Sequence, residues 1–344
     1  MSPVLQEFSG LTDYIIKVYA YSASTKVLSR DNIAHTVIRH PLTPEDVSTL
    51  LIKEQPEAII TATSMHPWAL EKEFILQARK LSIPCIAVLD FWSNYSMRFD
   101  DANGNLIIPD KIAVMDKNAQ TAMVSEGFPD ESIIITGQPA FDEFYNKTFF
   151  RPEKSSNQSL SIQPIHILFV SQPIAQYYPV NSPQYPGYNE FTVLQSLVDF
   201  RKHTRYIGQI KISVILHPTH NEMHFEDFFQ KDVNFIADEA SGYQAIQNCD
   251  LICGMTSTKL FESFLMSIPV FSLQPGCKNP FQFPIINGQT IPVFNDQEEI
   301  NMELEKGLFE GSFPVQNIKW ETPFDGKATQ RVVELIHNLL IPDD

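Results

Sequence analysis

The sequence has no long apolar segment and few cysteines. No apolar run approaches the roughly 18 residues of a membrane-spanning helix, and the opening stretch MSPVLQEFSG lacks the basic and apolar regions of a secretory signal. We therefore expect a cytoplasmic protein without a transmembrane segment. The four cysteines lie in or beside apolar stretches, which favours reduced and mostly buried thiols; they are Cys85, Cys249, Cys253 and Cys277.

Positive charge is also scarce. Lysine and arginine number 25 against 41 aspartates and glutamates, which gives a formal net charge of -16. A chain this acidic repels phosphate backbones and anionic lipid surfaces, so we expect neither nucleic acid nor a membrane as a partner. Small phosphorylated ligands remain compatible with this charge, because backbone amides at helix N-termini bind phosphate locally.

The sequence does contain a regular alternation of short apolar runs with amphipathic stretches, which is typical of an α/β fold. Its 344 residues suffice for two domains. The short runs are apolar throughout, which indicates parallel strands covered on both faces. We predict two Rossmann-like domains facing each other across a cleft, with ligands bound at the carboxyl ends of the strands.

A polar stretch without apolar periodicity, RPEKSSNQSLSIQP at residues 151–164, predicts the interdomain linker. The N-terminal domain then covers residues 1–150 and the C-terminal domain residues 165–344, with a last helix over 327–340 near the domain junction. The opening stretch SPVLQEFSGL already has a helical pattern, and the first strand is expected only at 15–21. We therefore expect the N-terminal domain to lack the opening strand and glycine-rich turn of such domains.

The most informative segment is residues 250–276. A buried strand ends at Gly254, a cluster of three hydroxyl residues opens a helix, and an acid follows one turn later; these residues are Thr256, Ser257, Thr258 and Glu262. Free amides, hydroxyls and the positive end of a helix suit a pyrophosphate, and the acid suits ribose hydroxyls. The alternative is that the hydroxyls only cap the helix and that Glu262 is a solvated acid.

The order of motifs in both halves resembles that of the GT-B glycosyltransferases and the UDP-N-acetylglucosamine 2-epimerases. In the C-terminal half, the hydroxyl cluster and the helix are followed by the strand Ser267-Ile268-Pro269-Val270, where the family has Gly in place of Ser267. In the N-terminal half, a strand ending at Asp90, a second strand over 111–115 and a turn at Gly137-Gln138 recur in the epimerase order. The resemblance covers roughly residues 56–145 and 165–340.

The resemblance implies a role for each matching position. The nucleotide diphosphate and ribose would lie against Gly254, Thr256, Ser257, Thr258 and Glu262. Gln172 would approach the phosphates and Tyr243 the base. On the N-terminal, acceptor side, Asp90 and Arg98 match the acid and the arginine of the epimerase acidic loop, and Gln138 and Asp142 match the turn beside the hinge.

The sequence departs from the epimerases after that loop, where residues 100–109 offer only Asp100 and Asp101 as acids. Epimerisation needs several positioned acid and base groups, so we predict a nucleotide-sugar-dependent glycosyltransferase instead. Its substrate is a nucleoside diphosphate sugar, its acceptor a cell-surface glycan or polysaccharide precursor, and it requires no cofactor. A non-catalytic nucleotide-sugar-binding protein and a 2-epimerase-like enzyme are the alternatives.

An inverting transferase needs one base near the acceptor hydroxyl. We expect Asp90 to be this base, in a site desolvated by Phe91 and Trp92, with Glu71 and Glu73 next. The alternatives are that Asp90 caps a turn and that the two glutamates are exposed acids in the first turn of a helix.

The segment HPTHNEMH, residues 217–224, follows a predicted strand and carries three histidines. Zinc is one interpretation of this spacing, but no helix places the three side chains on one face, and no acid or thiol lies at motif spacing. We predict no metal site. His217, at the end of the strand, is instead expected to donate to a phosphate.

Overall fold

The computed structural model describes residues 1–11, 14–64, 66–101, 103–146, 164–204, 208–237, 239–278, 291–313 and 324–340. The chain divides into two compact units, each described by itself below. Unit 1 combines Met1–Lys147 with Trp320–Asp344, and unit 2 is Thr148–Lys319. The predicted linker, except for its last residue, lies outside the described residues.

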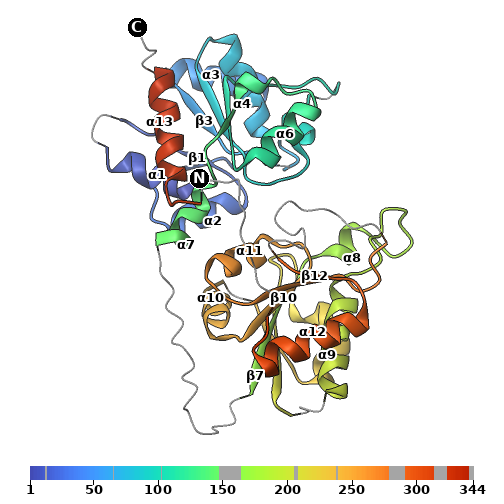
Figure 1. Ribbon diagram of the computed structural model, residues 1–344. Helices are drawn as coiled ribbons and strands as arrows, with labels where there is room; N and C mark the ends of the chain where they lie inside the picture. The colour runs from blue at the N-terminus through green and yellow to red at the C-terminus, as the bar shows by residue number, and fades with distance from the viewer. Residues whose placement is uncertain are drawn as a thin grey trace. The chain divides into compact units, whose positions relative to one another are not determined.

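Unit 1 contains a parallel sheet in the order β3-β4-β5-β6, and the strands β1 and β2 pair separately and also in parallel (Figure 1). β4 is buried along its whole length, which agrees with the uniformly apolar pattern of its residues. The strands are β1 (Tyr19–Ala20), β2 (Thr36–Val37), β3 (Ile59–Thr61), β4 (Cys85–Val88), β5 (Lys111–Val114) and β6 (Ile133–Ile135).

The helices of unit 1 begin where the sequence provides capping residues. Thr43 and Asp46 form a reciprocal capping box at the start of α3, and Asp116 accepts a hydrogen bond from the amide of Ala119 at the start of α6. The helices are α1 (Ser2–Ser9), α2 (Ala23–Arg30), α3 (Pro44–Glu54), α4 (Leu70–Lys80), α5 (Tyr95–Phe99), α6 (Lys117–Ser125), α7 (Asp142–Asn146), α13 (Ala328–Leu340) and the 3-10 turns η1 (Asp130–Ser132) and η2 (Pro139–Phe141).

The first strand is shorter than the sequence predicts. Residues 15–21 contain only the two-residue strand β1, and Ile15 is 93% exposed. The expected helix is present as α1, and it buries Val4 and Phe8. The apolar run therefore predicted too long a strand, because the first residues of the run have no strand partner in the described structure.

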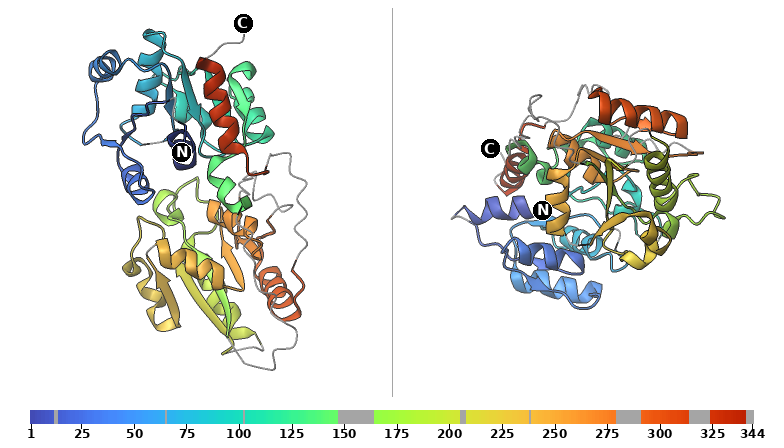
Figure 2. Two further views of the ribbon diagram at one scale, coloured as in Figure 1. Left: turned by 90° about the vertical axis from the view of Figure 1, so that its left-hand side faces the viewer. Right: turned by 90° about the horizontal axis from the view of Figure 1, so that it is seen from below.

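The predicted boundary of the C-terminal domain is wrong at its far end. α13 packs on unit 1, alongside α1 (Figures 1 and 2). Val332 and Ile336 share a buried cluster with residues of α1, β4 and β5: Val4, Phe8, Ile86, Val88 and Ala113. Asp142 fixes the start of this helix, since its carboxylate accepts hydrogen bonds from the amides of Ala328 (3.1 Å) and Thr329 (2.7 Å).

Unit 2 contains a parallel sheet in the order β12-β11-β10-β7-β8-β9. The chain proceeds outward from β7 to β9, and then returns to the other side of β7 with β10. The strands are β7 (Ile165–Val170), β8 (Ile210–Ile215), β9 (Val233–Ile236), β10 (Leu251–Gly254), β11 (Val270–Leu273) and β12 (Val293–Phe294). This is the doubly wound order that the alternating pattern predicts.

Buried apolar side chains of β7, β8, β10 and β11 form the core of unit 2 together with those of its helices. The helices are α8 (Ile174–Tyr177), α9 (Glu190–His203), α10 (Glu239–Asn248), α11 (Thr258–Leu265), α12 (Gln297–Glu310) and the 3-10 segment η3 (Glu222–Lys231). Within the described residues, no helix combines the length and the hydrophobicity that crossing a bilayer requires.

Candidate functional site

In unit 2, two polar residues meet where the strand order reverses. Gln172 lies two residues beyond β7 and Thr256 two residues beyond β10, and these strands are neighbours in the sheet. The side-chain oxygen of Gln172 accepts a hydrogen bond from the amide of Thr256 (2.7 Å), and its Nε2 donates to Thr256 Oγ1 (3.2 Å). Ligands of doubly wound sheets bind at this reversal, so the geometry supports Gln172 and Thr256 as site residues.

The N-terminus of α11 lies beside this pair. Ser257 is its cap and accepts a hydrogen bond from the amide of Lys259 (3.3 Å), and Thr258 is the first helical residue. Within the described residues, the amides of Ser257 and Thr258 have no acceptor. Two unoccupied donors at the positive end of a helix suit an anionic group.

Gly254 and Glu262 have contacts of their own in unit 2. A side chain at position 254 would lie 2.9 Å from Leu260, so the glycine allows β10 and α11 to pack closely. Glu262 is largely buried, with its Oε2 3.7 Å from the ammonium group of Lys259. Contacts of these two residues with a nucleotide remain predictions.

Two further predicted residues belong to unit 2, and the structure describes the side chain of one of them, His217. His217 Nδ1 lies 2.8 Å from Thr219 Oγ1, and partial burial lowers the pKa of the His217 imidazole. The ring is therefore neutral at pH 7, and it donates through one nitrogen only. Tyr243 belongs to α10, but its side chain lies outside the described residues.

The three histidines of the 217–224 segment gather without forming a metal site in the described structure. The rings of His220 and His224 stack with centroids 4.7 Å apart, and His220 Nε2 lies 3.9 Å from the buried carboxylate of Glu190. Among the described residues, no three potential ligands are placed to share an ion. Burial lowers the pKa of His220 and raises that of Glu190, so the ring is neutral at pH 7.

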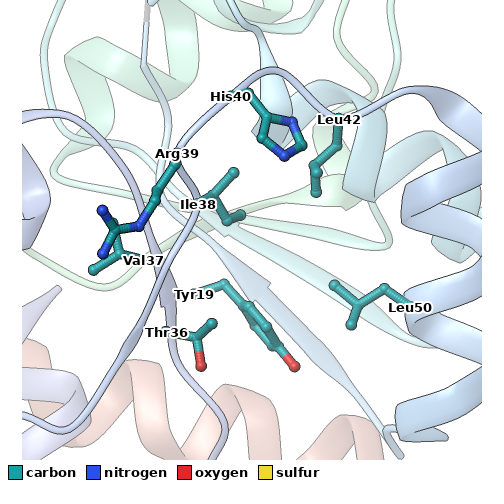
Figure 3. Close-up of a pocket in the computed structure, with 8 residues that line it drawn as sticks. All are labelled: Tyr19, Thr36, Val37, Ile38, Arg39, His40, Leu42 and Leu50. Carbon is teal, nitrogen blue, oxygen red and sulfur yellow. The ribbon is translucent and has the colours of Figure 1, made fainter.

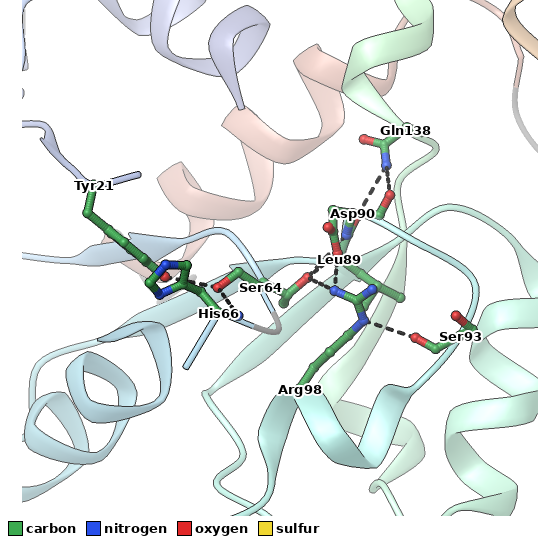
Figure 4. A network of polar contacts seen from close by, with 9 residues as sticks. Tyr21, Ser64, His66, Leu89, Asp90, Ser93, Arg98 and Gln138 are labelled. Carbon is green, nitrogen blue, oxygen red and sulfur yellow. Dashed lines mark hydrogen bonds and ion pairs between the residues drawn. The ribbon is translucent and has the colours of Figure 1, made fainter. Parts of the chain in front are cut away.

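In unit 1, Asp90 and Arg98 form an ion pair just beyond β4 (Figure 4). Arg98 donates to Asp90 Oδ1 (2.5 Å) and to the carbonyl of Ser93 (2.9 Å). Thr63, which follows β3, donates to the same Asp90 oxygen (2.6 Å) and accepts a hydrogen bond from the Asp90 amide (3.2 Å). The resemblance implied Asp90 and Arg98 as site residues, whereas their ion pair and the contacts of Thr63 were not predicted.

The expected desolvation of Asp90 by its aromatic neighbours is wrong. The Asp90 side chain is 53% exposed, whereas that of Arg98 is 6% exposed. Trp92 is buried elsewhere and donates to Asp116 (2.6 Å). The buried guanidinium, held by Ser93, therefore presents the carboxylate of Asp90 to solvent, which suits a base that must reach a substrate.

Gln138 is buried beneath Asp90. Its Nε2 lies 3.3 Å from the carbonyl oxygen of Leu89 and 3.2 Å from that of Asp90, and it donates to both (Figure 4). The predicted ligand contact of Gln138 remains a prediction, and its observed contacts hold the end of β4 in place.

The two alternative bases differ in their surroundings. Glu71 Oε2 accepts a hydrogen bond from the hydroxyl of Tyr21 (2.6 Å), whereas Glu73 accepts one from Gln77, one turn further along α4 (2.6 Å). Tyr21 also lies 2.9 Å from Ser64 Oγ. Sequence analysis missed Tyr21, Thr63 and Ser64, although polar residues directly after strands were a usable signal.

A pocket of about 310 Å³ lies elsewhere in unit 1, beside β1 and β2 (Figure 3). Its lining contains none of the predicted site residues and is mainly apolar; it consists of Tyr19, Thr36, Val37, Ile38, Arg39, His40, Leu42 and Leu50.

Comparison with known proteins finds no matching family model and no matching curated sequence. Solved structures do match. Staphylococcus aureus MnaA with UDP has a TM-score of 0.67 and 15% identity, over 100% of this chain and 94% of that one. A UDP-GlcNAc 2-epimerase from Neisseria meningitidis bound to UDP-GlcNAc has a TM-score of 0.67 and 13% sequence identity. The match covers 98% of this chain and 96% of that chain.

Anabaena HepE in complex with UDP and glucose is a third structure of this kind, with a TM-score of 0.59 and 12% identity over 97% of this chain and 90% of that chain. At such identities the likeness establishes the fold. This chain therefore has the two-domain Rossmann-like GT-B fold, which it shares with solved structures of UDP-N-acetylglucosamine 2-epimerases.

Proposed function

We propose that this protein is an enzyme that binds a UDP-sugar through unit 2 and acts on the sugar as a 2-epimerase. The observation that carries this proposal is the pair of hydrogen bonds between Gln172 and Thr256 at the reversal of strand order. It lies beside the amides of Ser257 and Thr258, which have no acceptor among the described residues. The solved neighbours bind UDP or UDP-GlcNAc, which supports uracil as the base and a UDP-sugar as the class of ligand.

Unit 1 supplies the candidate acid and base groups. Epimerisation at C2 breaks the C2–H bond, and because no carbonyl group adjoins C2, the electron pair forms a C1–C2 double bond while the bond from C1 to UDP breaks. Return of a proton to the opposite face of C2 and re-formation of the C1 bond to UDP give the epimer, so the reaction needs a base and an acid. Asp90 is exposed and held by Arg98 and Thr63, and Glu71 is held by Tyr21. We assign proton removal to Asp90, with Glu71 as the second group.

Sugar transfer to a glycan or polysaccharide precursor is a second candidate, favoured by the state of the two other acids. Asp100 is paired with Lys72 (2.6 Å), and Asp101 accepts hydrogen bonds from the amides of Asn103 and Asn105. Neither carboxylate is therefore an obvious participant in proton transfer. A transferase needs only one base, and Asp90 suffices for it.

Calorimetry with UDP tests the nucleotide site. Gln172→Glu keeps an oxygen that accepts from Thr256 but places a negative charge beside the diphosphate. We expect the Kd for UDP to rise about tenfold or more, which corresponds to the loss of a hydrogen bond to a charged group. Gln330→Glu makes the same change in charge on an exposed residue of α13 in unit 1, and it should leave the Kd unchanged.

Product analysis by NMR tests the reaction. Incubation with UDP-GlcNAc in deuterium oxide should yield the 2-epimer with deuterium at C2, and Asp90→Asn should abolish this while leaving the Kd for UDP nearly intact. Release of UDP only after addition of a saccharide acceptor would establish transfer instead. Nucleotide binding with neither product would identify a non-catalytic binding protein and refute the proposed activity.

A further inference from the structure

The connection between β7 and α9 in unit 2 carries no charge. Residues 167–189 include no aspartate, glutamate, lysine, arginine or histidine, although the whole chain has a net charge of -16. The part beyond β7, residues 173–189, contains four tyrosines, four prolines and four asparagines or glutamines, and it includes α8 (Figure 1). This part, hereafter the neutral loop, therefore offers hydroxyl, amide and aromatic groups without ionic ones.

The neutral loop exposes apolar side chains near its centre. Tyr177 is 61% exposed, Tyr178 41% and Val180 63%. Single exposed apolar residues are ordinary on protein surfaces, but three within four positions form a small patch. Gln176 and Asn181 flank the patch in the sequence and are exposed as well, and their side-chain amides have no hydrogen-bond partner among the described residues.

Backbone hydrogen bonds order this exposed part of the loop. The amide of Tyr178 donates to the carbonyl of Ile174 (2.8 Å), and the amide of Ser182 donates to the carbonyl of Pro179 (2.7 Å). The prolines also fix φ at their own positions. Binding of a ligand therefore costs little additional backbone entropy, because folding has already ordered the groups that would contact it.

Both ends of the neutral loop are anchored within unit 2. At the first end, the buried carboxylate of Glu190 accepts a hydrogen bond from the amide of Ala175 (2.9 Å). At the other end, Gly187 has a φ of 101°, and a side chain there would clash with the carbonyl oxygen of Gly276. Only glycine allows this close approach of the two segments. The loop is therefore held on both sides of its exposed tyrosines.

The absence of charge narrows the class of ligand. Phosphate groups, nucleic acids and acidic lipids are bound through lysine and arginine side chains, which the neutral loop lacks. A specific protein interface involves about 20 to 30 residues on each side. The loop provides only 17 residues, and several of them are buried. A small neutral surface with aromatic rings and amides fits an uncharged, hydroxyl-rich ligand better than either class.

We propose that the neutral loop binds a neutral oligosaccharide chain. The ring faces of Tyr177 and Tyr178 suit the apolar C–H faces of pyranose rings, and the amides of Gln176 and Asn181 suit hydroxyl groups as both donors and acceptors. A chain of several sugar rings is favoured over a single sugar, because the exposed groups extend from position 176 to position 181. The inference goes beyond the proposed function, since it requires neither UDP nor a reaction at the sugar.

Saturation-transfer NMR and calorimetry on the full chain test this surface. The neutral probes are chitohexaose and maltohexaose, and a hyaluronan hexasaccharide is the acidic probe. We expect saturation transfer to a neutral probe and none to the hyaluronan fragment, because the loop offers no cation and the chain as a whole is acidic. The measurements are made without nucleotide and then repeated with UDP.

Three variants test which side chains bind the probe. Tyr177→Ala removes one ring and should raise the Kd of the neutral probe about two- to tenfold, which corresponds to the loss of one stacking contact. Tyr177→Phe keeps the ring and should retain the affinity of the parent protein. Tyr145→Ala removes a tyrosine of similar exposure (59%) from unit 1, and it should leave the Kd unchanged. We expect the urea midpoint of unit 2 and the Kd for UDP to stay the same in all three.

Sedimentation velocity tests whether a second copy occupies the patch instead. A dimer of the parent protein that Tyr177→Ala abolishes would assign the patch to self-association and overturn the proposal. The proposal is likewise overturned if neither neutral probe binds, or if the hyaluronan fragment binds as tightly as they do. Parent affinity for the neutral probe in the double variant Tyr177→Ala/Tyr178→Ala would also overturn it. Failure to bind UDP refutes only the proposed nucleotide site, because the oligosaccharide is measured without nucleotide.

Discussion

Replacement of Arg98 by methionine tests how the Asp90 carboxylate is held. The change keeps an apolar stem of similar length but removes a guanidinium that is only 6% exposed. The guanidinium donates a partly buried hydrogen bond to the Ser93 carbonyl. Because the donor is charged, this hydrogen bond contributes about 1.5 to 3 kcal/mol to the free energy of unfolding. The ion pair with Asp90 adds about 0 to 1 kcal/mol, because the Asp90 side chain is half exposed and solvent screens it.

We therefore expect Arg98→Met to lower the free energy of unfolding of unit 1 by about 1.5 to 4 kcal/mol. Asp90→Asn should lower it by less than about 1 kcal/mol, because an exposed amide is solvated and still accepts from Thr63. The asymmetry follows from the difference in burial of the two partners.

Urea denaturation followed by tryptophan fluorescence measures both changes, since Trp68 and Trp92 report on unit 1. A double-mutant cycle isolates the energy of the pair itself. Equal losses for Arg98→Met and Asp90→Asn would refute the reasoning, because the energy would then reside in the ion pair. A loss below about 1 kcal/mol for Arg98→Met would refute it equally.

Three other perturbations test separate features. Ile336→Ala, in the buried cluster shared by α13 and α1, should cost about 2 to 5 kcal/mol in the urea transition of unit 1 and leave that of unit 2 unchanged. Thiol titration of the native protein should find one fast group, the partly exposed Cys277, and four after denaturation, because burial encloses the others and raises the pKa of Cys85 to about 12. Burial raises the pKa of Glu190, so the folded state binds this proton more tightly than the unfolded state and loses stability as pH rises above 4.5. Glu190→Gln should therefore raise the free energy of unfolding relative to the parent protein, and this difference should become larger between pH 5 and pH 8. A difference independent of pH would contradict a raised pKa of Glu190.

The features that the sequence predicted well depend on neighbours along the chain. The strand, the capping residue and the helix of residues 251–265 follow from local patterns. The helical pattern of residues 327–340 was likewise sufficient to place α13 within one residue of its observed start.

The features that it missed depend on contacts between distant segments. Thr63 and Asp90 are 27 positions apart, and Tyr21 and Glu71 are 50 apart. Only the pairing of strands brings such residues together, and hydrophobic periodicity does not specify which strand ends become neighbours. The unit to which α13 belongs was unpredictable for the same reason, since an amphipathic helix fits any apolar surface of suitable shape.

The membership of α13 in unit 1 has a consequence for biosynthesis. Unit 2 is encoded as one uninterrupted segment inserted into unit 1, whose two segments flank it. A ribosome therefore synthesises all of unit 2 before it synthesises the helix that supplies Val332 and Ile336 to the core of unit 1. The usual order, in which the N-terminal domain folds first, is therefore reversed for the final step. Until α13 is synthesised, the apolar surface of α1 and β4 in unit 1 is uncovered, while unit 2 completes its sheet. This exposed surface is where a chaperone would bind the nascent chain.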